Sequence, residues 1–235
     1  MKLIFIRHGD PNYEKDSLTD KGWREAELLA KRVEEWNVKE FFVSPLGRAQ
    51  DTARVSLEKI GRKAKTLDWL KEFFVLIDDP MGGKKWIPWD FLPSWWTKQE
   101  ILYDRDRWAL ESHLATGSVE TEQKKVIRGI DTLLKEYGYV RKERYYEVIN
   151  PNKDTLVFFC HMGVQLLILS HLLGIAAPVL WHGMFTAPTS VTILCTEEQN
   201  KGEAFFRCKC LGDTSHLYVA KEEPSNSGFF KEIYE

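Results

Sequence analysis

The sequence predicts an α/β fold with a mainly parallel sheet and an antiparallel edge. Short apolar runs alternate with amphipathic segments of helical spacing along much of the chain. This alternation is typical of parallel strands joined by right-handed helical crossovers. The segments 189–198 and 203–213 are strand-like and are separated by a short polar turn. They predict a hairpin, which adds the antiparallel edge.

Local signals place the individual elements. Residues 2–6 form an apolar run, expected to be a strand buried on both faces. Thr19 or Asp20 can cap the helix that follows, and Gly61 can end the next helix. The chain from Glu222 onward contains Pro, Ser and Gly and is expected to be loosely attached. Further strands are expected at 39–44, within 63–70 and, after a turn, within 146–160, and helices within 18–36, 44–61, 118–139 and 164–175.

Bulk composition limits the class of protein. The chain has 235 residues, of which 43% are hydrophobic, and we expect residues 1–235 to form a single domain. The net charge of -2 gives no global field that would attract nucleic acid or an anionic membrane. The apolar stretch before Arg7 is too short for a secretory signal, and no run approaches the length of a membrane span. We therefore expect a soluble, cytoplasmic protein.

Residues 73–118 differ in character from the rest. Prolines and glycines cluster there, and Trp86, Trp89, Trp95 and Trp96 lie close together in the sequence. We interpret this segment as a Trp-rich insertion or lid, because it interrupts the alternation of strands and helices. Aromatic rings can form the apolar walls of a substrate pocket, or they can form the core of the insertion or an oligomer contact.

Three apolar strands end in the same manner. The first is followed by Arg7 and His8, the second by the motif SPLGR with Arg48, and a late strand by His161. The carboxyl ends of parallel strands open onto one edge of the sheet, where ligands bind. Independent segments would therefore bring two arginines and two histidines to one place.

This group of side chains suits the chemistry of a phosphate ester. Arginine offers a planar fork of donors for phosphate oxygens, and Arg48 lies near a helix start that also favours an anion. A neutral histidine can attack phosphorus, and neighbouring arginines should lower its pKa. Phosphoryl transfer needs positioning and charge stabilisation above all. The set supplies both with no metal and no cofactor.

Together these motifs resemble the histidine phosphatase superfamily, in its phosphoglycerate mutase-like branch. The resemblance rests on RHG at 7–9, SPLGRAQDTA at 44–53 and HMG at 161–163. It implies a three-layer α/β/α sandwich. It also implies that His8 is the nucleophile that becomes phosphohistidine, while Arg7, Arg48 and His161 hold the phosphoryl oxygens.

The resemblance also bears on the acid that protonates the leaving group. Members of the family often carry this acid in an L-x-E segment after the second helix, and Leu70-Lys71-Glu72 occupies that place. Glu72 is therefore the expected proton donor, with Asp78, Asp79 and Asp90 as rivals. We interpret Ser44 as a turn residue and His216 as structural. These are the remaining polar candidates near the motifs.

The resulting hypothesis is a metal-independent phosphomonoester hydrolase that acts on a small phosphorylated metabolite. The alternatives are a cofactor-dependent phosphoglycerate mutase and a non-catalytic phospho-ligand binding protein. No nucleic-acid or membrane partner is expected, and a homo-oligomer is compatible with the sequence. These motifs do not identify the physiological substrate. We expect the Trp-rich segment to determine which substrate is bound.

Overall fold

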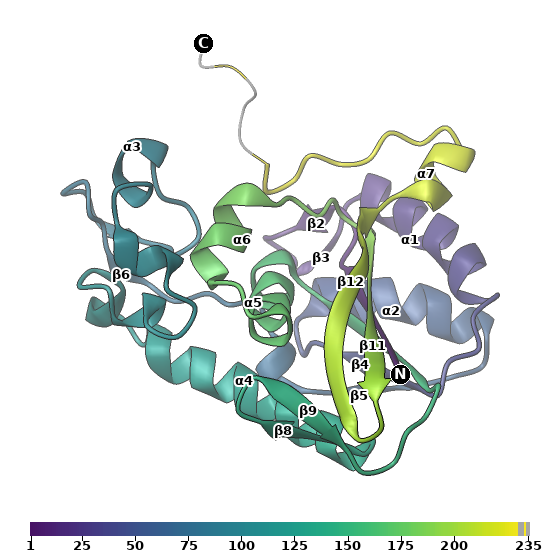
Figure 1. Cartoon of the computed structure of the whole chain (residues 1–235). Helices are drawn as coiled ribbons and strands as arrows, with labels where there is room; N and C mark the ends of the chain where they lie inside the picture. The colour runs from purple at the N-terminus through teal and green to yellow at the C-terminus, as the bar shows by residue number, and fades with distance from the viewer. Residues whose placement is uncertain (230–232, 234–235) are drawn as a thin grey trace.

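A mixed sheet of eight strands runs through the centre of the computed structural model, which describes residues 1–229 and 233 (Figure 1). The strand order is β5-β4-β10-β1-β11-β12-β9-β8. The strands are β1 (Lys2–Arg7), β4 (Glu40–Val43), β5 (Ala64–Thr66), β8 (Tyr139–Lys142), β9 (Tyr145–Val148), β10 (Thr155–Cys160), β11 (Val191–Asn200) and β12 (Glu203–Asp213). Two small ribbons lie outside it, β2 (Pro11–Asn12) with β3 (Ser17–Leu18) and β6 (Ile77–Asp78) with β7 (Lys85–Trp86).

The sheet has a parallel half and an antiparallel half. Strands β5, β4, β10 and β1 pair in parallel. Strand β11 pairs antiparallel with β1, and β12, β9 and β8 continue in the same manner. The expected hairpin is confirmed as β11 and β12. The antiparallel part is therefore wider than an edge, because β8 and β9 extend it beyond the hairpin.

Helices cover both faces of the sheet, as a three-layer α/β/α arrangement requires (Figure 1). Helices α1 and α2 pack together on one face, and α4 and α5 pack on the other. The helices are α1 (Asp20–Val33), α2 (Gly47–Lys59), α3 (Pro93–Trp96), α4 (Val119–Glu136), α5 (Met162–Leu173), α6 (Ala177–Gly183) and α7 (Ser215–Val219). Short 3-10 helices η1 to η4 occupy Asp68–Leu70, Glu100–Tyr103, Trp108–Leu110 and Leu114–Thr116.

Alternation along β1 builds two separate cores. Leu3 and Phe5 belong to the cluster beneath α4 and α5, whereas Ile4 and Ile6 belong to the cluster beneath α1 and α2. All four side chains are buried, because successive residues of a strand point to opposite faces and both faces are covered. The apolar run at the start of the chain is thus a central strand, as expected.

Capping signals are observed where the sequence places them. The Thr19 side chain accepts a hydrogen bond from the backbone N–H of Gly22 at the start of α1. Gly61, expected to end the second helix, follows Ile60, the C-cap of α2, and its φ of 63° lies in the left-handed region that glycine adopts without strain. Within residues 1–229, no helix has both the length and the apolar character needed to cross a membrane.

The Trp-rich segment 73–118 contains β6, β7, α3 and the 3-10 helices η2 to η4, beside α4 and α6 (Figure 1). Trp108 is fully buried and meets Trp181 edge-on, with ring centroids 5.2 Å apart. Of the four clustered tryptophans, Trp89, Trp95 and Trp96 pack partly buried against the same core, so part of the cluster is core. That the segment is an insertion acting as a lid stays a prediction.

Candidate active site

The register of the central strands explains why the two histidines meet. In the parallel pair of β1 and β10, Arg7 lies opposite Cys160. The next residues, His8 and His161, therefore leave the sheet side by side, and their ring centroids are 5.0 Å apart. Both rings are buried. The structure thus brings together the two histidines that the sequence places more than 150 positions apart.

His8 has one ring nitrogen committed and one free. Its Nδ1 lies 2.8 Å from the carbonyl oxygen of Gly9, an acceptor, so Nδ1 carries the proton and donates it. The lone pair then resides on Nε2, as nucleophilic attack requires. Burial lowers the pKa of His8 well below its usual value, and the charges of Arg7 and Arg48 lower it further. The imidazole is therefore neutral at pH 7.

His161 is held from the opposite side by a residue that the sequence analysis assigned only to a turn. Ser44 follows β4, the other neighbour of β10, and its Oγ lies 2.7 Å from Nε2 of His161. The same Oγ accepts a hydrogen bond from the N–H of Leu46. Nε2 of His161 therefore accepts a hydrogen bond from the Ser44 hydroxyl, and the single ring proton of His161 lies on Nδ1. Burial and the nearby His8, Arg48 and Arg7 also lower the pKa of His161.

Arg7 lies in the floor of the site with its guanidinium held by backbone. Its Nη1 donates to the carbonyl of Thr186 at 2.7 Å, and its Nη2 donates to the carbonyl of Ser227 at 2.8 Å. The guanidinium also lies over the ring of Phe185, 5.6 Å from its centroid. These contacts fix the direction of the fork before any ligand arrives.

Arg48 lies just inside the start of α2, as expected, and it has an acidic partner that the sequence did not reveal. Its Nη1 contacts Oδ1 of Asp16 at 2.5 Å, and Oδ2 of Asp16 accepts a hydrogen bond from the N–H of Gly47. Asp16 adopts a φ of 45°, which is uncommon for a residue with a side chain. A carboxylate therefore occupies the N-terminus of α2, where free N–H groups favour an anion.

Several buried nitrogens of these side chains have no hydrogen-bond partner. Nε of Arg7, Nε of Arg48 and Nδ1 of His161 have no hydrogen-bond partner among the described residues. Buried donors are rarely left unpaired in folded proteins. Three of them around His8 match a group with several acceptor oxygens.

A cavity of about 560 Å³ opens over Arg7, His8 and Arg48, whereas His161 is fully buried and is not among the residues that line it. Arg7, His8 and Arg48 line it together with Glu72, the expected proton donor. Glu72 accepts hydrogen bonds from the N–H groups of Phe73, Gly163 and Val164, the last two at the start of α5. It therefore has a fixed position beside the late histidine. Lys71, Tyr13, Leu46, Phe74, Trp89, Met162 and Gly228 complete the wall.

The rival carboxylates lie elsewhere. Asp78 pairs with Lys85 across the small ribbon of β6 and β7, and Asp79 accepts from the N–H groups of Met81 and Gly83. Asp90 lines a neighbouring cavity rather than that of His8. His216 lies in α7 against Thr189, and burial together with Arg32 lowers its pKa to about 4. Of the four acids considered, only Glu72 lines the cavity over His8.

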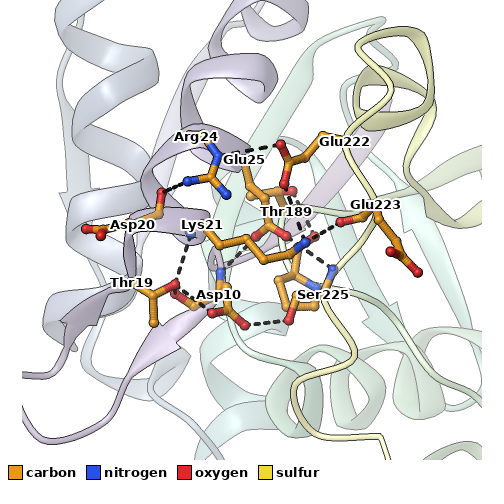
Figure 2. Close-up of polar contacts among 12 residues, drawn as sticks. Asp10, Thr19, Asp20, Lys21, Arg24, Glu25, Thr189, Glu222, Glu223 and Ser225 are labelled. Atoms are coloured by element: carbon orange, nitrogen blue, oxygen red, sulfur yellow. Dashed lines mark hydrogen bonds and ion pairs between the residues drawn. The ribbon is translucent and has the colours of Figure 1, made fainter.

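The C-terminal segment 222–229 is attached to the site, in contrast to the loose tail expected from Glu222 onward. The remainder of that expected tail, at 230–232 and 234–235, lies outside the described residues. Figure 2 shows Ser225 reaching Asp10 and Glu25, and Lys21 reaching Glu222 and the backbone of Glu223. Glu25 is fully buried and also accepts from the N–H of Asp10. The segment runs from α7 across the top of the molecule (Figure 1).

Comparison with known proteins agrees with this geometry. Residues 3–81, which include Arg7, His8, Arg48 and Glu72, match the model of the histidine phosphatase superfamily (branch 1). The first third of the chain is thus similar to the histidine phosphatase superfamily. A search of curated protein sequences finds no match.

Solved structures share the fold over nearly the whole chain. A mutant phosphoserine phosphatase from Entamoeba histolytica, in complex with phosphoserine, is 19% identical, covers 92% of this chain and 98% of its own, and has a TM-score of 0.61. The α-ribazole phosphatase of Shigella flexneri is 20% identical over 91% of this chain and 96% of its own, with a TM-score of 0.58. A mycobacterial glucosyl-3-phosphoglycerate phosphatase is 16% identical over 91% of this chain and 99% of its own, with a TM-score of 0.54.

Proposed function

We propose that the protein is a phosphomonoester hydrolase that acts through a phosphohistidine on His8 and uses no metal ion. The observation that carries this proposal is the free Nε2 of a neutral His8, placed among three buried and unpartnered donor nitrogens. The similarity of residues 3–81 to the histidine phosphatase superfamily supports it. The substrate is a small phosphorylated metabolite.

In the first step, Nε2 of His8 attacks phosphorus and the bond from phosphorus to the ester oxygen breaks. The electron pair leaves with that oxygen, which takes a proton from the carboxyl group of Glu72. Arg7, Arg48 and His161 donate hydrogen bonds to the three equatorial oxygens, whose charge is shared in the transition state. The alcohol is released and the phosphoryl group stays on His8.

In the second step, water replaces the alcohol. Glu72, now ionised, takes a proton from the water as the water oxygen attacks phosphorus. The bond between phosphorus and Nε2 breaks, its electrons return to the imidazole, and inorganic phosphate is released. Glu72 ends protonated and His8 neutral, so the cycle returns the site to its starting state.

The test is phosphate release from a panel of phosphate monoesters in the presence of EDTA, followed by acid- and base-quenched samples in which a phosphohistidine is sought by mass spectrometry. We expect release with EDTA present and a base-stable, acid-labile phosphoryl group on His8. Phosphoryl exchange between glycerate positions without net release would instead identify a mutase. Phosphate binding with neither reaction would identify a non-catalytic binding protein.

His8→Ala should abolish turnover and leave the fold intact, because His8 is the one histidine among the described residues that line the cavity. Circular dichroism and the unfolding midpoint check the fold. His113→Ala, which removes a histidine paired with Glu111 outside the cavity, is the matched control and should retain activity. Near-normal turnover by His8→Ala would contradict the mechanism.

A further inference from the structure

A second cavity, of about 440 Å³, adjoins the one that contains His8. The two cavities share Trp89, Met162 and Gly228 in their walls. A group attached to a phosphoryl unit in the first cavity can therefore extend into the second. We call the second one the aromatic cavity, because its walls include Trp86, Trp89, Trp96, Trp181, Phe185 and Phe229.

The indole N–H groups of two of these tryptophans are already used inside the protein. Nε1 of Trp89 donates to the carbonyl of Phe73 at 3.0 Å, and Nε1 of Trp181 donates to the carbonyl of Gly163 at 3.0 Å. Tryptophans whose N–H groups are occupied in this way offer a ligand only apolar ring surface.

His182, also in the wall, has both ring nitrogens engaged. Nδ1 lies 2.7 Å from the carbonyl of Pro178, and Nε2 accepts a hydrogen bond from the N–H of Phe91. Its ring stacks on Trp96 with centroids 4.8 Å apart. Burial lowers its pKa, so it is neutral at pH 7. The aromatic cavity therefore gains no positive charge from its histidine.

The charge in the wall of the aromatic cavity is negative. No lysine or arginine lines it within the part of the chain that the structure describes, whereas Asp90 does. The carboxylate of Asp90 has no ion-pair or hydrogen-bond partner among the described residues, and its burial raises its pKa to about 6. A second anion placed here would find no counter-charge and would face this carboxylate.

We propose that the aromatic cavity binds the leaving group of the substrate, and that the substrate is the phosphate monoester of an apolar, ring-sized alcohol without negative charge. The proposal rests on the proposed function, since it assigns the alcohol half of the same substrate. Asp90 is then a specificity-determining residue that disfavours leaving groups with a carboxylate or a second phosphate.

The first experiment measures binding of three phosphonates that cannot be hydrolysed, by calorimetry at pH 7.5. Methylphosphonate has no leaving group, benzylphosphonate has an apolar ring, and 2-carboxyethylphosphonate has an anionic group. We expect benzylphosphonate to bind about tenfold or more tightly than methylphosphonate, from burial of the ring. We expect 2-carboxyethylphosphonate to bind no more tightly than methylphosphonate. Equal affinities, or a preference for the carboxylate, would overturn the proposal.

Two variants locate the effect. Trp86→Ala removes a wall residue that is 41% exposed, so its loss leaves the core intact, and we expect it to weaken benzylphosphonate severalfold and methylphosphonate not at all. Asp90→Asn should strengthen 2-carboxyethylphosphonate about fivefold or more and leave benzylphosphonate unchanged. Asp78→Asn is the matched control, because it removes a carboxylate of the same segment outside the cavity. Equal effects of the two asparagine variants would refute the role of Asp90.

The outcomes separate this proposal from the function on which it rests. If neither the phosphonates nor inorganic phosphate binds, and no ester is hydrolysed, the proposed function fails. If phosphate and all three phosphonates bind equally, the phosphate site holds and only the assignment of the aromatic cavity fails. Values of kcat/KM then compare an apolar leaving group with an anionic one during turnover. We expect the value for benzyl phosphate to be larger than that for 3-phosphoglycerate.

Discussion

At the scale of single residues, the site depends on which nitrogen of each imidazole carries a proton. Gly9 sets this choice for His8 through its carbonyl, and Ser44 sets it for His161 through its hydroxyl. The two histidines receive opposite assignments, one presenting a lone pair to the ligand and the other presenting a proton. Neither partner touches the expected phosphoryl group, so we regard both as positioning residues.

Ser44→Ala should lower kcat about tenfold with a smaller change in KM, because His161 loses the contact that fixes its ring and its tautomer. The informative measurement is a double-mutant cycle with His161→Ala. In the background of His161→Ala, removal of the Ser44 hydroxyl should have no further effect on kcat. If the two losses add, Ser44 acts by a route other than His161.

Glu72→Gln should reduce turnover most for substrates with poor leaving groups. The amide keeps the size of the side chain but cannot give a proton to the departing oxygen. We expect a loss of about 100-fold or more for an alkyl phosphate and a much smaller loss for p-nitrophenyl phosphate, whose leaving group needs no acid. Equal losses for the two esters would indicate another proton donor, or a role for Glu72 confined to the water step.

At the scale of elements, the C-terminal segment 222–229 connects α1 to the floor of the site. Ser225 contacts Asp10 and Glu25 on one side, and two residues later the carbonyl of Ser227 receives Nη2 of Arg7 (Figure 2). Phe229 then meets Phe185 edge-on, with centroids 4.9 Å apart. The segment therefore supports both Arg7 and the wall of the aromatic cavity.

Ser225→Ala should raise KM severalfold with a smaller effect on kcat, because the loss of the Ser225 hydroxyl frees the segment that aligns Arg7. Orthophosphate affinity, measured by calorimetry, should weaken in parallel. Ser118→Ala is the matched control, since that side chain is exposed and makes no capping hydrogen bond. Unchanged phosphate affinity in Ser225→Ala would show that Arg7 does not depend on this segment.

The elements that position the site were predictable from the sequence, and several of its contacts were not. Arg7, His8, Arg48 and His161 follow strands whose apolar runs are local signals, so their convergence could be inferred from the logic of parallel sheets. The pairing of Arg48 with Asp16 depends on a turn with an unusual φ, which no periodicity reveals.

The attachment of the C-terminal segment also had no local signal. Ser225 bonds Asp10 and Glu25 across about 200 positions, and its Pro, Ser and Gly neighbours are typical of exposed loops. Ser44 similarly gains its role only from the register of β4 beside β10. Tertiary placement, rather than composition, determines these contacts.

At the scale of the whole molecule, buried titratable groups make stability depend on pH. Two buried and two half-buried histidines have a lowered pKa, and each contributes stability that is present above pH 6.5 and is lost as pH falls toward its folded pKa. The pKa of Glu25 is raised to about 7 by burial. The contribution of Glu25 to the free energy of unfolding is therefore present below about pH 4.5 and is lost as pH rises through 7. The four histidines are His8, His161, His182 and His216.

We therefore expect the free energy of unfolding to rise between pH 5 and 6.5 and to level off or fall slightly above pH 7. Urea unfolding monitored by tryptophan fluorescence across this range measures it. His216→Asn should flatten the rise, since it removes a group whose folded pKa is about 4. Glu25→Gln should steepen the same rise, because the variant no longer loses stability through ionisation of Glu25 as pH increases. A profile that is flat from pH 5 to 8 would contradict this account.

The strand order has a consequence for biosynthesis. Strand β10 lies between β4 and β1, so the two strands that are synthesised first do not become neighbours through direct pairing. A ribosome exposes His8 and Arg48 early, but the strand that fills the gap between them, and the second histidine that follows it, emerge roughly a hundred residues later. Until then the nascent chain has no closed phosphate site. The proposed nucleophile is made first, and we expect the protein to become able to use it only when the late strand has inserted.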